Sequence, residues 1–408
     1  MPVRLQNLVA VTVFAVAATV ATTAHAQKKY DPGASDTEIK IGNIMPYSGP
    51  ASAYGTIGRL EAAYFKLINE KGGINGRKIN FISYDDSYSP PKTVEQARRL
   101  VEDDEVLLIF NSLGTPGNSA IHKYMNAKKV PQLFVATGAT KFSDPKNFPW
   151  TMGWAPSYQT EGHIYAKYVL ENHPGKKVAV LYQNDDYGKD VLKGFKDGLG
   201  AQASDLIVAE APYETSDPTV DSQLLSLKAS NADIFLNITT PRFAAQSIKK
   251  LAEMNWKPLH ILNNVATSAG AVLKPAGFEN AQGILSTVVS KDPTDTLWKD
   301  DKGMKEWVAF MDKYYPEGDK TSGFNAFGYM LAQTLVHVLT RAGDDLTREN
   351  IMRQAANLKN VELGLLLPGV TLNTSPNDYS PLKQLQMMRF KGESWELFGP
   401  IRRGPAGS

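Results

Sequence analysis

Short apolar runs alternate with longer amphipathic segments along most of the chain. The first apolar run, at residues 38–44, is followed at 56–71 by a segment of helical length that ends at Gly72-Gly73. Strands that alternate with such helices are typical of a parallel sheet covered by helices on both faces. The pattern therefore predicts an α/β protein.

The same alternation continues almost to the end of the chain. Strands are predicted at 38–44, 78–84, 106–110, 132–136, 177–183, 206–211, 233–238, 259–262 and 283–289. Helices are predicted at 56–71, 91–103, 118–127, 161–171, 189–198, 220–229, 243–254, 302–314, 324–342 and 348–358. A hairpin-like extension is predicted at 371–397, where two prolines interrupt a loose alternation.

A stretch rich in proline and aromatic residues, at 148–156, separates two blocks of similar plan. The long helical segments from residue 302 onward follow the second block. Two α/β lobes with extra helices supplied late in the chain imply that the chain crosses between the lobes more than once. We expect the crossing segments to act as a hinge.

The first 26 residues have the pattern of a secretory signal peptide. Arg4 precedes an apolar and small-residue stretch at 8–21, and Ala24-His25-Ala26 provides a small-residue cleavage site. Cleavage is predicted after Ala26, with an uncleaved membrane anchor as the alternative. Nothing after residue 30 has eighteen uninterrupted apolar residues, so we expect a free periplasmic protein.

Composition and motifs argue against several classes of function. The 408 residues contain 44 Lys plus Arg, 42 Asp plus Glu and no cysteine, so neither a nucleic acid partner nor a thiolate site is expected. The histidines show no metal-ligand spacing, and no nucleophile-elbow, dinucleotide-binding or phosphate-loop motif occurs. Aspartate pairs at 85–86 and 185–186 are more typical of turns and caps than of an acid/base pair. We therefore expect no enzyme, no metal and no cofactor.

Candidate binding loops follow the predicted strands. In an open α/β sheet, ligands bind beyond the carboxyl ends of the strands, where loops meet helix N-termini. The loops here are rich in Gly, Ser, Thr, Asn and Tyr, which offer backbone amides, hydroxyl groups and aromatic walls to a small carboxylate. These loops lie at 46–55, 111–118, 137–140, 184–188, 239–240 and 263–264.

Some of these loop residues have a simpler interpretation. Thr137 and Thr140 are equally suited to helix N-capping. Gly114 and Gly138 are equally suited to ordinary turns. Composition alone therefore leaves a structural role and a binding role open for each of these four residues.

A combination of short motifs is more specific. The first block contains I-G at 41–42, M-P-Y-S-G-P at 45–50, Y-G at 54–55, I-N at 68–69, K-G-G-I-N-G at 71–76 and Y-D-D at 84–86. In the second block, N-D-D-Y-G at 184–188 follows an apolar run at 178–182. Together these motifs resemble the branched-chain amino acid binding proteins of ABC importers, the leucine/isoleucine/valine type. The resemblance covers roughly residues 38–399.

The resemblance implies a two-lobed type I periplasmic binding protein fold, in which each lobe is a parallel sheet flanked by helices. It places lobe I at 38–157 and 290–370 and lobe II at 158–289 and 371–400, with three hinge crossovers near residues 157, 289 and 370. It also implies that the lobes close on a small molecule and that the protein delivers this molecule to a permease in the inner membrane. We expect a monomer.

Matching the ligand site of the resembling family gives ten candidate residues. Tyr54 and Tyr187 match the aromatic residues of the two lobes, and each precedes a glycine that opens a helix. The serine-rich carboxylate loop of the family falls on 113–115, where Gly114 replaces the usual serine. The ten candidates are Tyr54, Leu113, Gly114, Thr115, Thr137, Gly138, Ala139, Tyr187, Thr239 and Asn264.

The main departure from the family concerns the ammonium group of an amino acid ligand. Family members hold this group with an acidic residue after the strand that ends here at Leu262, and that position falls on or beside Asn264. No Asp or Glu occurs between Glu253 and Glu279. Because an unpaired buried ammonium costs several kcal/mol, we expect an aromatic or otherwise apolar carboxylate as the ligand.

The predicted function is therefore capture of a small organic carboxylate for an ABC importer, with a branched-chain amino acid left open. Arg242, at the start of a predicted helix, is either a counter-charge for the ligand or a solvated side chain. The main alternative is the extracellular ligand-sensing module of a receptor, which requires a membrane span or a fused domain. A secreted hydrolase is the weaker alternative, because no nucleophile motif is present.

Overall fold

Two β-sheets organise the part of the chain that the computed structural model describes, which is residue 1 and residues 28–404. The first sheet has five parallel strands. Their spatial order is β3 (Lys78–Asp85), β2 (Glu38–Met45), β4 (Leu108–Phe110), β5 (Gln132–Val135) and β6 (Thr151–Gly153). We call this sheet and the helices packed on it lobe I.

The second sheet has seven strands, and with its helices it forms lobe II. Their order is β14 (Ser394–Arg403), β13 (Gln384–Lys391), β11 (Leu285–Val288), β10 (Leu259–Leu262), β9 (Ile234–Ile238), β7 (Val178–Gln183) and β8 (Ile207–Tyr213). The last five are parallel, whereas β13 and β14 form an antiparallel hairpin on the edge. A separate parallel pair joins β1 (Lys29–Tyr30) to β12 (Asp345–Leu346).

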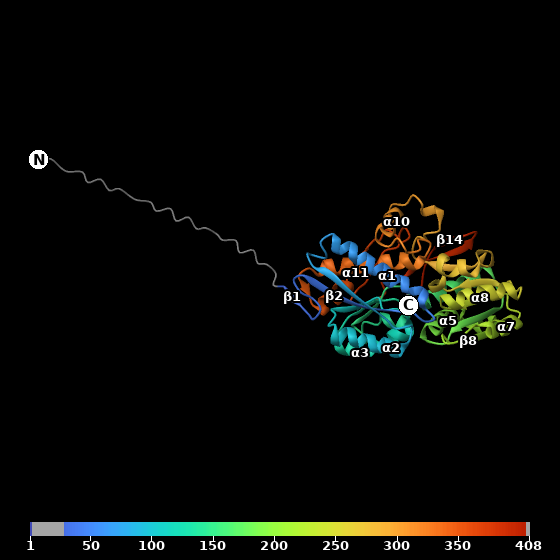
Figure 1. Cartoon of the computed structure of the whole chain (residues 1–408). Helices are drawn as coiled ribbons and strands as arrows, with labels where there is room; N and C mark the ends of the chain where they lie inside the picture. Colours follow the sequence, from blue (N-terminus) through green and yellow to red (C-terminus); the bar gives the residue numbers. More distant parts are fainter. Residues whose placement is uncertain (2–27, 405–408) are drawn as a thin grey trace.

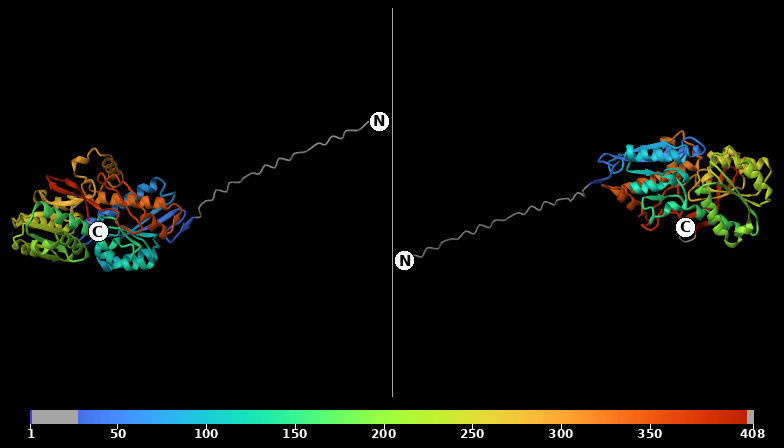
Figure 2. Two further views of the ribbon diagram at one scale, coloured as in Figure 1. Left: turned by 180° about the vertical axis from the view of Figure 1, so that it is seen from behind. Right: turned by 90° about the horizontal axis from the view of Figure 1, so that it is seen from below.

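Helices cover both sheets, and Figures 1 and 2 show the two resulting lobes side by side. Lobe I contains α1 (Gly55–Glu70), α2 (Pro90–Arg98), α3 (Thr115–Lys128), α10 (Lys302–Tyr314), α11 (Gly323–Ala342) and α12 (Arg348–Ala355). Lobe II contains α4 (Tyr158–Asn172), α5 (Asp186–Leu199), α6 (Ala203–Leu206), α7 (Asp221–Ala229), α8 (Pro241–Glu253) and α9 (Lys274–Ala276).

The late helices belong to lobe I because they complete its core. α11 lies beside α1, as the neighbouring orange and blue ribbons in Figure 1 show. Leu331 and Leu335 of α11 are fully buried in the same hydrophobic cluster as Leu60 of α1 and Ile41 of β2. The chain therefore passes from lobe I to lobe II after β6, returns after β11, and enters lobe II again at β13. These three passages agree with the two-lobed plan predicted from the sequence.

Helices α3, α4 and α5 each begin three residues earlier than the sequence pattern predicts, α5 at Asp186 rather than residue 189. α3 begins at Thr115 rather than residue 118, because Pro116 suits the first turn of a helix. α4 begins at Tyr158 rather than residue 161, and the Ser157 hydroxyl accepts a hydrogen bond from the amide of Thr160. These helix starts border the space between the lobes, so these shifts place the chain for the site described below.

Of the two segments predicted at the ends of the chain, one is displaced in the structure and the other is not described by it. The predicted hairpin at 371–397 lies further along the chain, at 384–403, where it extends the lobe II sheet. The predicted signal peptide lies outside the described residues. Among the residues that the structure describes, no helix has the length and apolar character needed to cross a membrane.

Candidate functional site

A cavity of about 160 Å³ lies between the lobes, against the carboxyl ends of their strands. Lobe I supplies its walls from α1, the loops after β4 and β5, and the first turns of α11. Lobe II supplies α5, the loops after β9 and β10, and the end of β11. The segments that follow β6 and β11 complete the wall, so the two lobes and the chain between them enclose one space.

Eight of the ten residues predicted from the sequence border this cavity. They are Tyr54, Leu113, Gly114, Thr115, Thr137, Gly138, Tyr187 and Asn264.

The other two predicted residues do not border the cavity. Ala139 packs in the hydrophobic core of lobe II around Tyr165. The Thr239 hydroxyl donates to the side chain of Asn237 at 2.7 Å, and its neighbour Thr240, which begins α8, borders the cavity instead. At this loop the structure therefore places Thr240, and not Thr239, on the cavity wall, because the Thr239 side chain bonds back to β9.

Hydroxyl and amide donors gather on the lobe I side. The Thr115 and Thr137 hydroxyl oxygens lie 2.6 Å apart, and the amide of Ala139 donates to the Thr137 hydroxyl at 3.0 Å. The Thr137 side chain also forms a hydrogen bond with the Tyr158 hydroxyl, so the hydroxyl groups of Thr115, Thr137 and Tyr158 form one cluster at this end of the cavity. Thr115 also begins α3, and because Pro116 has no N–H and the Asn118 amide bonds the Gly114 carbonyl, the amides of Thr115 and Gly117 are the first-turn donors without a partner in the helix. This end of the cavity therefore offers several donors to an anion.

Glycine is required at both loops that carry these donors. Gly114 has φ +101°, and a Cβ there would lie 2.5 Å from the ring of Tyr88. A Cβ on Gly138 would lie 2.4 Å from the carbonyl oxygen of Pro156 and 2.8 Å from the ring of Tyr158. A side chain at either position would therefore clash, which the sequence alone does not reveal.

The two predicted tyrosines face the cavity but use their hydroxyl groups elsewhere. Tyr54 is 7% exposed and donates across the cleft to the carbonyl of Val265 at 2.9 Å, so it joins the two lobes directly. Tyr187 is 2% exposed and donates to the side chain of Asn263 at 2.8 Å. Burial raises the pKa of both phenols well above the ordinary value, which keeps them neutral. Each ring is therefore held as an uncharged wall.

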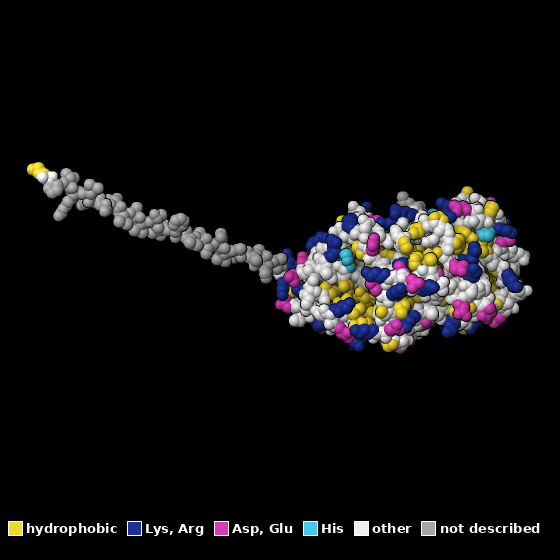
Figure 3. Space-filling model, turned by 90° about the horizontal axis from the view of Figure 1, so that it is seen from above, with side chains coloured by type: hydrophobic (Ala, Val, Ile, Leu, Met, Phe, Trp, Pro, Cys, Tyr) yellow, Lys and Arg dark blue, Asp and Glu magenta, His cyan; other side chains and the backbone are white. Residues whose placement is uncertain are grey.

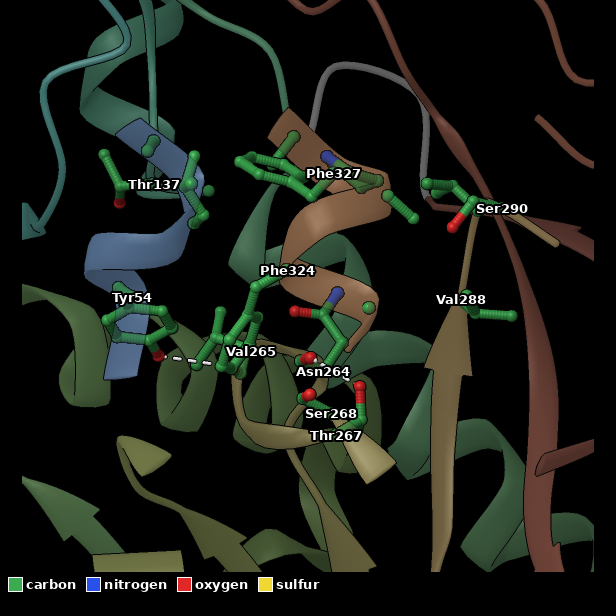
Figure 4. Close-up of a pocket in the computed structure, with 18 of the residues that line it drawn as sticks. Tyr54, Thr137, Asn264, Val265, Thr267, Ser268, Val288, Ser290, Phe324 and Phe327 are labelled. Carbon is green, nitrogen blue, oxygen red and sulfur yellow. Dashed lines mark hydrogen bonds between the residues drawn. The ribbon is translucent and has the colours of Figure 1, made fainter. Parts of the chain in front are cut away.

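Aromatic residues that the sequence analysis missed form the remaining wall. Phe324 and Phe327 project from the first turns of α11 toward the side where Tyr54 and Thr137 lie (Figure 4). The ring of Phe324 lies 4.9 Å from that of Tyr54, and Trp154 packs edge-on against Phe327 at 5.5 Å. The signal was weak, because apolar residues in a long helix usually belong to a core.

Two charged residues border the cavity after β11, close to where the chain returns to lobe I. The Lys291 ammonium forms an ion pair with Asp301 at 2.8 Å and donates to the carbonyl of Gly364 at 2.8 Å. Asp292 accepts hydrogen bonds from the amide and the hydroxyl of Thr294, and burial raises its pKa to about 6. Both residues fell outside the loops that the sequence analysis considered.

A further carboxylate, that of Glu161, lies behind the lobe II wall. It is 1% exposed, in the first turn of α4. One oxygen accepts from the amide of Asn264 at 2.7 Å, from Tyr165 and from Thr287 at 3.3 Å, and the other accepts from the Asn263 amide group at 2.5 Å. Burial raises the pKa of Glu161 to about 7. An acidic residue is thus next to Asn264 in space although none is near it in the sequence.

The other candidate groups have structural roles. Asp185 accepts from two amides in the first turn of α5, and Asp85 accepts from the amides of Tyr47 and Ser48. Arg242 is exposed and donates to the carbonyl of Pro218, away from the cavity. Within the described residues, no group of three or more His, Cys, Asp or Glu side chains is arranged to hold a metal ion.

Comparisons with known proteins agree with this geometry. A family model described as periplasmic binding protein matches residues 38–394. Leu/Ile/Val-binding protein homolog 7 of Brucella abortus is 23% identical over 376 residues, which cover 88% of this chain and 90% of that protein. The leucine-specific-binding protein of Salmonella typhimurium is 28% identical over 171 residues, which cover 41% of this chain and 45% of that protein.

Solved structures share the fold at low sequence identity. A fatty acid ABC transporter substrate-binding protein from Thermomonospora curvata has a TM-score of 0.79 and 22% identity, and the match covers 92% of this chain and 95% of that one. A branched chain amino acid ABC transporter from Thermus thermophilus with bound valine has a TM-score of 0.81 and 16% identity, covering 90% and 97%. These likenesses confirm the two-lobed α/β fold.

The family also settles what kind of protein this is. Its members bind substrates and are not enzymes, which confirms the prediction of a binding protein and sets the hydrolase alternative aside. The chain belongs to the periplasmic binding protein family, in which its relatives are of the Leu/Ile/Val-binding type.

Proposed function

We propose that this protein is the periplasmic solute-binding component of an ABC importer and captures a small apolar or aromatic carboxylate between its lobes. The observation that carries the proposal is a cavity with hydroxyl and amide donors at the Thr115 and Thr137 end and a largely aromatic and aliphatic wall, in which the one cation among the described residues, Lys291, is paired with Asp301. Two of the similar solved structures are named as components of ABC transporters, which supports delivery to a permease. Export through a cleaved signal peptide remains part of the proposal.

The donor end suits one carboxylate. The free first-turn amides of α3, together with the partial positive charge of a helix N-terminus, favour an anion there. The hydroxyl groups of Thr115 and Thr137, with that of Tyr158 beside them, border the same end of the cavity and can donate to a carboxylate. The ammonium of Lys291 does not compete for the carboxylate, because Asp301 already neutralises it. The expected pose therefore directs the acid group to Thr115 and Thr137.

The rest of the cavity suits an apolar body of modest size. Phe324, Phe327 and Trp154 form its wall, together with the buried rings of Tyr54 and Tyr187. An apolar cavity of about 150 Å³ holds one benzene molecule. The cavity here has about the same volume, 160 Å³, so a single aromatic ring or a short branched chain fits it.

The lobe II loops offer no uncommitted carboxylate beside Asn264. Glu161 is the acidic group next to this residue, and its oxygens already accept four hydrogen bonds. An ammonium group placed at Asn264 would have to displace these donors, which would leave buried groups unpaired. This arrangement supports an acid without an amino group as the ligand.

One observation favours an amino acid as a second candidate ligand. Among the described residues, Asp292 is the acidic side chain that borders the cavity, and the amide and hydroxyl of Thr294 both donate to its Oδ1 atom. The relatives named for leucine, isoleucine and valine point to the same class. An ammonium held by Asp292 would place the amino group at the hinge end of the cavity, away from Asn264.

Titration calorimetry with benzoate, cyclohexanecarboxylate, adipate, leucine and valine tests the proposal. We expect the two cyclic monocarboxylates to bind and adipate not to, because the far end of the cavity has no uncompensated cation. Mass spectrometry of the small molecule that leaves the purified protein on denaturation gives an independent answer. Tight leucine binding, with no binding of the cyclic acids, would overturn the ligand class.

Two variants separate the candidates. D292N removes the negative charge at the hinge end, so it abolishes leucine binding if Asp292 holds the ammonium, and leaves benzoate binding unchanged if it does not. T137V removes one hydroxyl from the donor end and is expected to weaken benzoate binding about tenfold. A matched control is T93V, which removes a buried hydroxyl that bonds Asp86 and Ser89 outside the cavity.

A further inference from the structure

The lobe II wall of the cavity is held by a single side chain that does not border the cavity. Glu161 is 1% exposed, and its carboxylate receives hydrogen bonds from the loop after β10 and from two other elements. Asn263 and Asn264 follow β10, Thr287 belongs to β11, and Tyr165 lies one turn further along α4. Of these, Asn264 and Thr287 border the cavity directly.

A relay of hydrogen bonds extends this hold to Tyr187. The Asn263 nitrogen Nδ2 donates to Glu161, which fixes the amide so that its oxygen Oδ1 faces the Tyr187 hydroxyl. Tyr187 then donates to Oδ1 at 2.8 Å. If the amide turned over, its NH₂ group would donate to the tyrosine oxygen instead, and the Tyr187 hydroxyl proton would lose its acceptor. The orientation of the Tyr187 ring therefore depends on the acceptor at position 161.

We propose that Glu161 is a positioning residue, which sets the lobe II half of the binding cavity through Asn263, Asn264 and Tyr187 without contacting the ligand. Each link is a buried hydrogen bond with one donor and one acceptor, so the direction of each is fixed. A buried donor or acceptor that loses its partner costs about 1–3 kcal/mol. The chain of three residues therefore has one satisfied arrangement, which places Tyr187 in the wall.

The variant E161Q tests the direction of the relay rather than the volume of the side chain. Its amide oxygen can still accept from the amide of Asn264, but its NH₂ group faces the NH₂ group of Asn263. Asn263 must turn over to remove this conflict, and Tyr187 then loses its acceptor. We expect E161Q to bind benzoate about tenfold more weakly than the unmodified protein.

The double variant E161Q/N263D restores the relay with the donor and acceptor exchanged. The carboxylate introduced at position 263 accepts from the new amide at position 161 through one oxygen and from Tyr187 through the other. The total charge is that of the original pair. We expect benzoate affinity to return to within about threefold of the original. A merely structural role for Glu161 does not predict this rescue, because N263D alone places two buried carboxylates together.

A second measurement needs no ligand. Hydrogen–deuterium exchange of the peptide spanning 262–267 reports whether the loop that carries Asn264 is held. We expect faster exchange in E161Q and a return toward the original rate in the double variant. S247A is the control, because the Ser247 hydroxyl is fully buried in lobe II but bonds only to Phe243 of its own helix. It should lower stability and leave both readouts unchanged.

The benzoate measurement rests on the proposed function, whereas the exchange measurement does not. The two therefore separate a failure of this inference from a failure of the proposed function. If no acid binds the unmodified protein, the ligand class fails while the exchange experiment still decides the role of Glu161. The inference would be overturned if exchange at 262–267 were as slow in E161Q as in the original protein. It would also be overturned if exchange did not recover in the double variant.

Discussion

Each lobe contains one buried glutamate that contacts an asparagine after a central strand, and the two pairs differ in hydrogen bonding. In lobe I, Glu61 of α1 accepts one hydrogen bond, from Asn111 after β4, while its other oxygen and the Asn111 side-chain oxygen have no protein partner. In lobe II, Glu161 accepts four. Both side chains are at most 1% exposed.

The difference shows how partners decide the charge of a buried acid. Burial raises the pKa of Glu61 well above the ordinary value, and a single hydrogen bond offsets little of this shift. A protonated Glu61 can donate to the unpartnered oxygen of Asn111, which satisfies both atoms. For Glu161, four donors offset part of the burial cost, and its pKa rises only to about 7. Lobe I thus holds a neutral acid and lobe II an ionisable one.

Truncation of each glutamate gives the largest contrast. E161A leaves four donors unpaired, whereas E61A leaves the Asn111 amide group, and both remove the same volume from a buried site. We expect E161A to lower the free energy of unfolding by about 3–5 kcal/mol at pH 8 and E61A by about half as much. Chemical denaturation measures both. Equal losses would show that cavity formation, and not hydrogen bonding, dominates at the two sites.

Replacement by glutamine is expected to raise the free energy of unfolding at position 61 but not at position 161. Because the folded-state pKa of Glu61 is raised, its favourable contribution is complete below the unfolded pKa and declines as pH rises toward the folded pKa. E61Q removes this decline and completes the pairing with Asn111, so we expect it to stabilise the protein by about 1–2 kcal/mol at pH 8. E161Q should not stabilise at pH 8. Unfolding curves from pH 5 to pH 8 check the sign, which a destabilised E61Q would contradict.

The contact between the lobes is the next target. Tyr54 of lobe I donates to the carbonyl of Val265 in lobe II, so Y54F removes a hydrogen bond that exists only when the lobes are closed. We expect benzoate affinity to fall about threefold to tenfold, with little change in the stability of either lobe. Calorimetry paired with thermal unfolding tests this. A large loss of stability would instead place Tyr54 in the core of lobe I.

The smallest effect is expected at the surface between the lobes. Lys141 and Asp186 form an ion pair at 2.9 Å, and their side chains are 41% and 57% exposed. K141M should change the free energy of unfolding by less than about 0.5 kcal/mol, and the change should shrink further at about 1 M salt. Figure 3 shows basic and acidic side chains interspersed on the face of the molecule seen from above. A larger effect would mean that this pair controls closure.

The order of strands and helices was predictable from the sequence, because its signal is local periodicity. Strand β2 and helix α1, for example, were placed within one residue of their observed ends. The loops that carry Thr115, Thr137 and Asn264 were predictable for the same reason, since they follow predicted strands. The lobe boundaries at 157, 289 and 370 remain predictions.

Residues that act from a distance along the chain were not predictable. Glu161 lies about a hundred residues before Asn264, and nothing in the local pattern distinguishes it from a surface glutamate of an amphipathic helix. Phe324 and Phe327 looked like core residues of a long helix, which their burial partly makes them. Matching to the family selected Thr239, but only the structure shows that its hydroxyl bonds Asn237 and that Thr240 borders the cavity.

The cavity wall includes the very segments, Trp154–Pro156 and Ser290–Pro293, over which the chain changes lobes. A bound ligand that contacts these segments lies against the parts of the chain that are expected to rotate when the lobes open. Any substitution that reshapes this wall for a different molecule is therefore expected to alter the speed of release as well. A substitution that changes which ligand is bound is therefore also expected to change the rate of uptake.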